Sequence, residues 1–253
     1  MSTNAELRVR VARKTREALD ICSFELVARD NRALPAFSAG SHIDVQLPNG
    51  LTRQYSLCNE ASETHHYVIG VLNDPASRGG SRAMHELVQE GSELTISAPK
   101  NHFPLAHGAR KSLLFAGGIG ITPILCMAER LATIGEPFEM HYCTRSRERT
   151  AFLDRIGAGK LADRVSFHFD DGDANQKLDM AARLAVPEPD THIYVCGPKG
   201  FMDAVLGTAR ANGWAEAQIH YEFFNAEPVK SEADGSFEVQ LASSGRVVLV
   251  PKD

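Results

Sequence analysis

Five short segments carry residue types that could bind a redox cofactor, and the first is Arg53-Gln54-Tyr55-Ser56-Leu57. On a strand, alternation would place Arg53, Tyr55 and Leu57 on one face, with Gln54 and Ser56 on the other. A flavin needs an aromatic wall, a polar group at its ring edge and a cation for its phosphate, and this segment supplies one of each. Taken alone, the segment fits a packed barrel strand better, because short motifs often match by chance.

The second segment, Ser77-Arg78-Gly79-Gly80-Ser81, lies between a predicted strand over 67–72 and a predicted helix over 81–88. Glycines let backbone amides approach a phosphate closely, and a helix N-terminus adds unpaired N–H groups. Ser81 is predicted to cap the helix. A serine-capped flexible turn is an equally good interpretation of this segment by itself.

The third segment, 117–123, reads Gly-Gly-Ile-Gly-Ile-Thr-Pro and follows a short buried strand over 112–116. Thr122 is predicted as the helix cap and Pro123 as the first helical residue. A strand, a glycine-rich turn and a helix together receive the pyrophosphate of a dinucleotide. The spacing departs from GxGxxG, with Gly118, Gly120 and Pro123 at those positions, and therefore indicates a fold other than that of the Rossmann dehydrogenases. A structural glycine turn is the alternative.

The last two segments each end a predicted strand. Tyr194-Val195-Cys196-Gly197-Pro198 stands at a strand's carboxyl end, where open α/β sheets bind ligands. Cys196 could lie against a nicotinamide as a small contact, or it could be a buried structural cysteine. In Tyr221-Glu222-Phe223-Phe224, Phe224 could cover a flavin face, and core packing is the alternative.

The elements that must position these segments change character along the chain. Up to residue 100 the pattern is of short strands, including 7–11, 21–27, 42–47 and 67–72, with a hairpin signal at Asn49-Gly50. After residue 100, strands and helices alternate: strands 112–116, 139–143, 165–169, 192–195 and 219–223, with helices at 123–131, around 151 and at 200–211. The fold class expected is a two-domain protein, an antiparallel β-barrel followed by an α/β domain with a parallel sheet.

The predicted domains are residues 1–105, residues 106–226, and a C-terminal segment, 227–253. The last reads as a linker and one hairpin, Phe237 to Leu241 with Val247 to Val250. A lone hairpin is marginal in water, so it is interpreted as the opening of a truncated further domain.

Composition narrows the functional classes. The chain has 253 residues, 43% hydrophobic and 23% charged, with a formal net charge of −5. No basic run supports a nucleic-acid partner, no stretch reaches the roughly 18 apolar residues of a membrane span, and no signal peptide opens the chain. Five scattered cysteines without a CxxC pair favour a reducing cytoplasm and no metal site in this chain. His65-His66 is expected in solvent on a turn.

The order RQYSL, RGGS, GGIGITP, CGP and ExF resembles the ferredoxin–NADP reductase superfamily. Within it, the chain is similar to the phthalate dioxygenase reductase and vanillate O-demethylase reductase branch, over about residues 7 to 250. The stretches GSHIDV from Gly40, NHFPL from Asn101 and YCTRS from Tyr142 match as well. The resemblance implies a flavin barrel that binds FMN, followed by a nicotinamide domain.

The resemblance also assigns residues. Ser56 would hydrogen-bond near the reactive flavin nitrogen, and Cys196 and Glu222 would border the nicotinamide. The FMN site would comprise Arg53, Tyr55, Ser56, Leu57, Val71, Arg78, Gly79, Gly80, Ser81, Thr122 and Phe224. The dinucleotide site would comprise Gly118, Gly120, Thr122, Thr144, Arg145, Ser146, Phe152, Asp171, Cys196, Gly197 and Pro198. Family members mostly use NADH, but Ser146 replaces the acid of the phthalate enzyme and leaves NADPH open.

The branch carries a plant-type [2Fe–2S] domain held by four cysteines, and no cysteine follows Cys196. The chain is therefore expected to pass a hydride from NADH to FMN, and then single electrons to a [2Fe–2S] centre it does not hold itself. The implied partner is a Rieske-type oxygenase or O-demethylase component, with the reductase a monomer. The alternatives are a stand-alone flavin or ferric reductase and a non-catalytic flavin subunit.

Overall fold

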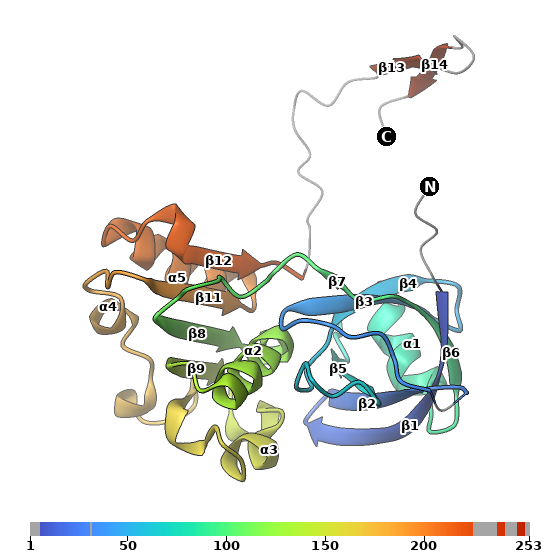
Figure 1. The fold of residues 1–253 in the computed structure, drawn as a ribbon, viewed down its shortest axis with the longest axis horizontal. Helices are drawn as coiled ribbons and strands as arrows, with labels where there is room; N and C mark the ends of the chain where they lie inside the picture. Colours follow the sequence, from blue (N-terminus) through green and yellow to red (C-terminus); the bar gives the residue numbers. More distant parts are fainter. Residues whose placement is uncertain (1–5, 31, 225–236, 241–246, 251–253) are drawn as a thin grey trace. The chain divides into compact units, whose positions relative to one another are not determined.

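The computed structural model describes residues 6–30, 32–224, 237–240 and 247–250. The chain divides into two compact units, Met1–Phe223 and Phe224–Asp253. The first unit holds an antiparallel sheet and a parallel sheet, with helix α2 (Ile121–Ile134) near their junction (Figure 1). This two-part architecture confirms the fold class expected from the sequence.

The antiparallel sheet has the strand order β4-β3-β6-β1-β2-β5, with β7 paired to β3. Its strands are β1 (Glu6–Ala18), β2 (Ile21–Ala28), β3 (Ser41–Gln46), β4 (Thr52–Ser56), β5 (Tyr67–Leu72), β6 (Glu93–Ser97) and β7 (Lys100–Asn101). The two ends of this order meet through an isolated bridge between Leu57 and Ile69, so the sheet is barrel-like without a continuous closing ladder. Helix α1 (Gly80–Leu87) buries Ala83 and Met84 in the barrel core.

Alternation of apolar residues forms these strands, because every second side chain faces the core. Val9 and Val11 on β1 and Phe24 and Leu26 on β2 are fully buried. The sequence indicated β1 only as far as Val11, because register shifts interrupt the alternation further along the strand. The predicted hairpin at Asn49-Gly50 is confirmed, with β3 and β4 paired around it and Gly50 at a φ of 82°.

The second sheet is entirely parallel, in the order β10-β9-β8-β11-β12. Its strands are β8 (Lys111–Gly117), β9 (Phe138–Thr144), β10 (Val165–Phe169), β11 (Thr191–Cys196) and β12 (Ile219–Glu222). Helix α2 covers one face, where Leu114 and Tyr142 are buried, and α5 (Lys199–Ala211) covers the other, against Leu113 and Phe115. The short helices α3 (Leu153–Gly157) and α4 (Met180–Arg183) lie in the β9–β10 and β10–β11 connections.

Both predicted caps are wrong. Helix α1 begins one residue earlier than expected, with Gly79 at the cap position and Ser81 inside the helix, where its hydroxyl accepts from the Asp74 N–H at 3.2 Å. Helix α2 is led in by a 3₁₀ turn, so Gly120 is its cap, and the Thr122 hydroxyl donates to the Ile119 carbonyl at 3.2 Å. Glycine takes both cap positions, and no side chain claims the first N–H groups of either helix.

In the second unit, β13 (Phe237–Gln240) pairs with β14 (Val247–Val250) in an antiparallel register that joins Phe237 to Val250. This confirms a hairpin there, while Leu241, its predicted end, lies outside the described residues. That the hairpin opens a further domain stays a prediction. Within the described ranges, no helix is both long and apolar enough to cross a bilayer.

Candidate functional site

The N-terminus of α1 and the side chain of Arg53 form the first part of the site. A Cβ placed on Gly80 would lie 2.6 Å from Arg53 Nε, so the guanidinium stem passes directly over the helix start. Gly79 adopts a φ of 94°, which costs a side-chain-bearing residue energy but suits glycine. Open helical N–H groups beside a cation fit a phosphate. Arg78 precedes them in the turn.

The second part of the site joins the two sheets. Ser56, at the end of β4, donates a hydrogen bond to Glu222 Oε2 at 3.4 Å, although the two residues are 166 positions apart in the sequence. Glu222 ends β12 and is the ladder partner of Cys196 at the end of β11. The three residues with predicted catalytic roles therefore lie together, where the barrel meets the carboxyl edge of the parallel sheet.

Burial sets the protonation of this group. Removal from water raises the pKa of Glu222 to about 7, only partly offset by the Ser56 hydrogen bond. Burial, reinforced by Glu222, also holds the pKa of the Cys196 thiol well above its usual value. Cys196 is thus a neutral thiol near pH 7, which suits a packing contact and not a thiolate nucleophile. Burial raises the pKa of Tyr55 to about 12, so its ring stays neutral.

The glycine-rich turn before α2 packs against the turn after β11. A Cβ on Gly120 would lie 2.2 Å from the Cys196 carbonyl oxygen, and one on Gly197 would lie 2.9 Å from the Gly117 Cα. Gly118, in contrast, has a φ of 51° and open space where a Cβ would stand. Backbone packing on one side and open space on the other are what a dinucleotide turn requires. Pro198 is the cap residue of α5.

A third glycine lets the parallel-sheet domain approach the barrel. Gly70 on β5 faces Thr122 and Phe152, with its notional Cβ 2.8 Å from Thr122 Cγ2 and 3.3 Å from Phe152 Cζ. Phe152 holds a left-handed φ of 62° and is only 3% exposed. Both side chains are thus buried in the seam between the sheets, and their contact with a flavin or dinucleotide stays a prediction.

The predicted ribose-binding residues meet at the carboxyl ends of β9 and β10. The Asp171 N–H donates to the Arg145 carbonyl at 3.2 Å, which brings these two residues together. Thr150, which the sequence did not single out, contacts Thr144 hydroxyl to hydroxyl at 2.6 Å and donates to the Ser146 carbonyl at 2.9 Å. These bonds hold the turn that carries Arg145 and Ser146. Only the spacing of Thr144 and Thr150 around a polar turn could have signalled this.

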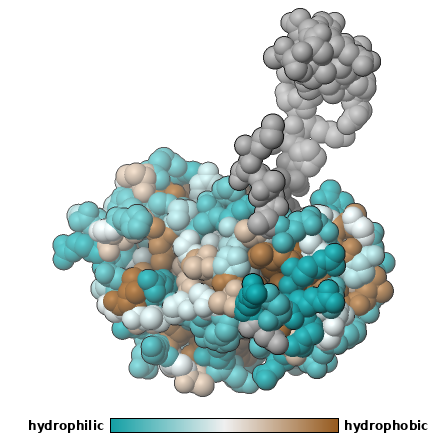
Figure 2. Space-filling model, turned by 45° about the vertical axis from the view of Figure 1, so that its right-hand side comes forward, coloured by the Kyte–Doolittle hydropathy of each residue, from teal (hydrophilic) through white to brown (hydrophobic). Residues whose placement is uncertain are grey.

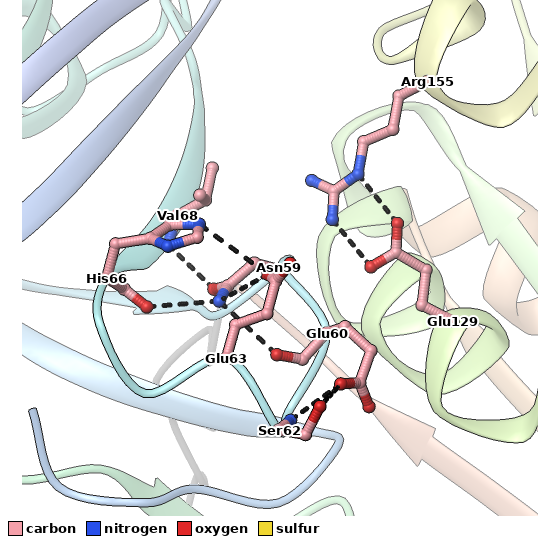
Figure 3. Close-up of polar contacts among 8 residues, drawn as sticks. All are labelled: Asn59, Glu60, Ser62, Glu63, His66, Val68, Glu129 and Arg155. Atoms are coloured by element: carbon pink, nitrogen blue, oxygen red, sulfur yellow. Dashed lines mark hydrogen bonds and ion pairs between the residues drawn. The ribbon is translucent and has the colours of Figure 1, made fainter. Parts of the chain in front are cut away.

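Polar contacts line the seam between α2, α3 and the loop after β4 (Figure 3). Arg155 makes a two-pronged ion pair with Glu129, at 2.7 and 2.6 Å. On the barrel side, Asn59 accepts from the Val68 N–H at 2.9 Å and donates to the His66 carbonyl at 3.2 Å. His66 was expected in solvent, and that is wrong: its side chain is only 14% exposed, because the loop folds back onto the seam.

The remaining predicted residues lie as follows. Leu57 and Val71 are buried in the barrel core, so only their backbone groups could face a ligand. Phe224 is 43% exposed and belongs to the second unit. The face of the molecule seen in Figure 2 is largely hydrophilic, with smaller apolar areas between. Tyr221 and Phe223 are also exposed, at 43% and 45%. They flank Glu222 in the sequence.

Among the residues that the structure describes, no three histidine, cysteine or carboxylate side chains are grouped to hold a metal ion. The candidate site is made of glycine turns, the Arg53 side chain and the Ser56–Glu222–Cys196 group.

Comparison with known proteins agrees with this architecture. Residues 114–206 match the oxidoreductase NAD-binding domain family. The vanillate O-demethylase oxidoreductase of Pseudomonas putida is 59% identical over 243 residues, covering 96% of this chain and 76% of that protein. The phthalate dioxygenase reductase of Burkholderia cepacia is 38% identical, covering 97% of this chain and 76% of the relative.

A solved structure of phthalate dioxygenase reductase matches with a TM-score of 0.84 at 38% identity, over 98% of this chain and 77% of that one. It is described as a modular structure for electron transfer from pyridine nucleotides to [2Fe–2S]. The fold and site thus define an NAD-binding oxidoreductase with a barrel domain. The chain belongs to the family of oxygenase reductases that contains vanillate O-demethylase oxidoreductase and phthalate dioxygenase reductase.

Proposed function

We propose that this chain is the NADH-dependent flavin reductase of a two-component Rieske-type oxygenase or O-demethylase. The observation that carries the proposal is the Ser56–Glu222 hydrogen bond, because it joins the barrel to the nicotinamide-side edge next to Cys196. The names of the relatives, reductases of vanillate demethylation and phthalate dioxygenation, support the same role. A cytoplasmic monomer is part of the proposal.

FMN fits the barrel because the α1 N-terminus offers unclaimed N–H groups beside Arg53, a site for one terminal phosphate. Tyr55 would present its ring to the flavin, and Ser56 would hydrogen-bond the ring edge. Thr122 would approach the flavin from the second domain. Glu222 and Cys196 would border the nicotinamide at the other side.

The dinucleotide would lie along the carboxyl edge of the parallel sheet. Gly118 leaves room for the pyrophosphate at the start of α2, where no side chain occupies the N–H groups. The turn carrying Arg145 and Ser146, with Asp171 beside it, would hold the adenosine ribose. Asp171 favours a ribose hydroxyl over a phosphate, and this supports NADH over NADPH.

Bound together, the cofactors supply the hydride transfer and the release of single electrons. The chain's own part is orientation. Ser56 positions the flavin edge, the neutral Cys196 thiol packs without reacting, and Gly70 lets the parallel-sheet domain approach the barrel. No acid–base pair is required for a hydride to pass. The electrons would leave to a [2Fe–2S] centre outside these residues.

Anaerobic stopped-flow mixing of FMN-loaded protein with NADH, and separately with NADPH, tests the proposal. Rapid flavin bleaching with NADH and slower bleaching with NADPH is expected. Absence of bleaching with both would overturn the proposal in favour of a non-catalytic flavin subunit. Efficient turnover of free flavin or ferric complexes, without an iron–sulfur acceptor, would instead identify a stand-alone reductase.

A further inference from the structure

The turn between β1 and β2 of the barrel contacts the parallel-sheet domain. Its two residues are Leu19 and Asp20, and the Leu19 N–H donates to the Glu148 carbonyl at 2.8 Å. Glu148 lies in the 3₁₀ turn Arg147–Arg149, which directly follows Ser146. A barrel turn therefore holds the segment next to the proposed ribose-binding residues.

An ion pair adds to this contact. Arg149 Nη1 lies 3.2 Å from Asp20 Oδ2, and the two side chains are 39% and 45% exposed. Exposed ion pairs often contribute little, because ordering two long side chains costs entropy. The backbone of Asp20, however, is held in place: its carbonyl accepts from the Asn73 N–H at 2.7 Å, and its φ is 62°. The short Asp20 side chain therefore keeps its carboxylate beside the 3₁₀ turn.

The backbone of Arg149 is adjacent to Ser146. The Arg149 N–H donates to the Ser146 carbonyl at 3.1 Å, and the Thr150 hydroxyl donates to the same oxygen at 2.9 Å. Arg145 and Arg147 flank Ser146 in the sequence and are exposed. Three arginines thus stand in one short segment, and guanidinium groups bind phosphate well.

The charge of this segment by itself favours a phosphate. Residues 145–149 contain three arginines and one carboxylate, that of Glu148. Asp171 adds a carboxylate near Arg145, since its N–H donates to the Arg145 carbonyl at 3.2 Å. Asp20 adds a further carboxylate, which comes from the barrel. Because Asp20 forms the ion pair with Arg149, its removal should leave a positive charge at the turn without compensation.

We propose that Asp20 is a specificity-determining residue that disfavours NADPH at the dinucleotide site. The inference rests on the proposed function and deepens it. NADPH differs from NADH by a phosphate on the 2′-oxygen of the adenosine ribose. By pairing with Arg149, Asp20 keeps one guanidinium from that phosphate, and its own negative charge opposes a second anion. A ribose hydroxyl carries no charge, so the binding of NADH does not depend on Asp20.

The test compares Asp20→Asn with a matched control, Glu93→Gln. Asparagine removes the charge and keeps the turn, because Asp and Asn both tolerate a left-handed φ. Glu93 forms an equally exposed ion pair with Arg29, at 3.0 Å, and both of these residues belong to the barrel. Each variant therefore loses one carboxylate from an exposed ion pair, but only Asp20→Asn loses it at the turn.

Titration calorimetry of the purified proteins measures the binding of 5′-AMP and 2′,5′-ADP, two fragments that differ by the 2′-phosphate. Asp20→Asn should bind 2′,5′-ADP roughly tenfold more tightly than the parent protein, a change of about 1.4 kcal/mol. Its affinity for 5′-AMP should not change. Glu93→Gln should alter the affinity for neither fragment. A gain in affinity is a result that mere damage to the fold would not produce.

A second variant assigns the gain to Arg149. Arg149→Met leaves the Asp20 carboxylate without its ion-pair partner, so 2′,5′-ADP binding should weaken. The double variant Asp20→Asn/Arg149→Met should lack the tenfold gain, because it has no guanidinium to release. A gain of the same size in the double variant would overturn the inference that Asp20 acts through Arg149.

Salt separates an effect of charge from a change in the shape of the turn. The difference in 2′,5′-ADP affinity between Asp20→Asn and the parent should shrink as the ionic strength rises from about 0.01 M to about 1 M, because salt screens exposed charges. A difference that is insensitive to salt would contradict the inference.

The two fragments also separate failure of this inference from failure of the proposed function. If the parent binds 5′-AMP and Asp20→Asn leaves the ratio of the two affinities unchanged, this inference is overturned and the dinucleotide site stands. If neither fragment binds to the parent or to any variant, the dinucleotide site is overturned, and this inference with it.

Discussion

The barrel and the parallel sheet contribute to the site in different ways. In the barrel, the proposed site residues Arg53 and Ser56 present their side chains from one strand, β4. In the parallel sheet, Gly118, Thr144 and Cys196 all stand at or just beyond strand carboxyl ends. The barrel site therefore depends on side-chain chemistry and strand register, whereas the parallel-sheet site depends on how closely backbone turns approach one another.

The largest loss of stability is expected at the seam between the two sheets. The α2–α3 side contributes an ion pair there, and the barrel side contributes neutral hydrogen bonds. Arg155→Met leaves Glu129 partly buried without its ion-pair partner, and this should cost about 3–5 kcal/mol. On the barrel side, Asn59→Ala removes the acceptor of the Val68 N–H, which should cost about 1–3 kcal/mol. Urea unfolding of both variants measures the loss in the free energy of unfolding. Equal losses in the two variants would contradict the expectation that the ion pair on the α2–α3 side is the stronger contact.

Gly120→Ala tests whether the parallel-sheet site is a matter of backbone approach. The added Cβ meets the Cys196 carbonyl at 2.2 Å, so we expect a stability loss of about 3 kcal/mol and weaker NADH binding. Gly207→Ala in α5 is the control, since nothing lies within 4 Å of its Cβ position and alanine favours a helix by about 1 kcal/mol. Thermal unfolding and NADH titration measure both variants. A stable Gly120→Ala protein with normal NADH affinity would be inconsistent with the close approach.

Arg53→Met is the corresponding test for the barrel, where a side chain should matter. Loss of one charge-assisted contact to a phosphate, about 1.5–3 kcal/mol, should weaken FMN binding roughly 10- to 100-fold and leave the fold intact. The control Arg10→Met removes an exposed arginine of β1, for which the described residues provide no ion pair. Fluorescence titration with FMN measures both, and equal affinities would remove Arg53 from the phosphate site.

Glu222→Gln should give the smallest effect. A pKa moved from 4.5 to about 7 corresponds to about 3.4 kcal/mol without screening, and the partial exposure of this side chain reduces that to on the order of 1–2 kcal/mol. The folded pKa of Glu222, about 7, exceeds the usual glutamate pKa of 4.5, so the native state binds more protons between these two pH values. Stability from this group is therefore complete below about pH 4.5 and is lost as the pH rises through 7. The variant should lack this part of the pH dependence in chemical denaturation. A parent and variant with parallel stability curves would show that Glu222 titrates normally.

Much of the fold followed from sequence patterns. The strand over 165–169 was predicted with its observed bounds, and the glycine-rich turns were recognised before both α1 and α2. The caps were not, because Ser81 and Thr122 satisfy general cap preferences while the positive φ of Gly79 and the 3₁₀ turn before α2 move each helix start. The strand β6 was missed as well, although Leu94 and Ile96 alternate there with more exposed polar residues.

By itself, the sequence determined which residues could do chemistry, since residue type and local order do not depend on the rest of the fold. The order of the motifs from Arg53 to Phe224 predicted a flavin and nicotinamide reductase. Only the tertiary structure decided that Ser56 meets Glu222, that Glu222 loses enough water to titrate near 7, and that Asp20 meets Arg149. Burial and contacts between the two domains produce these three facts, and both are properties of chain segments brought together from distant parts of the sequence.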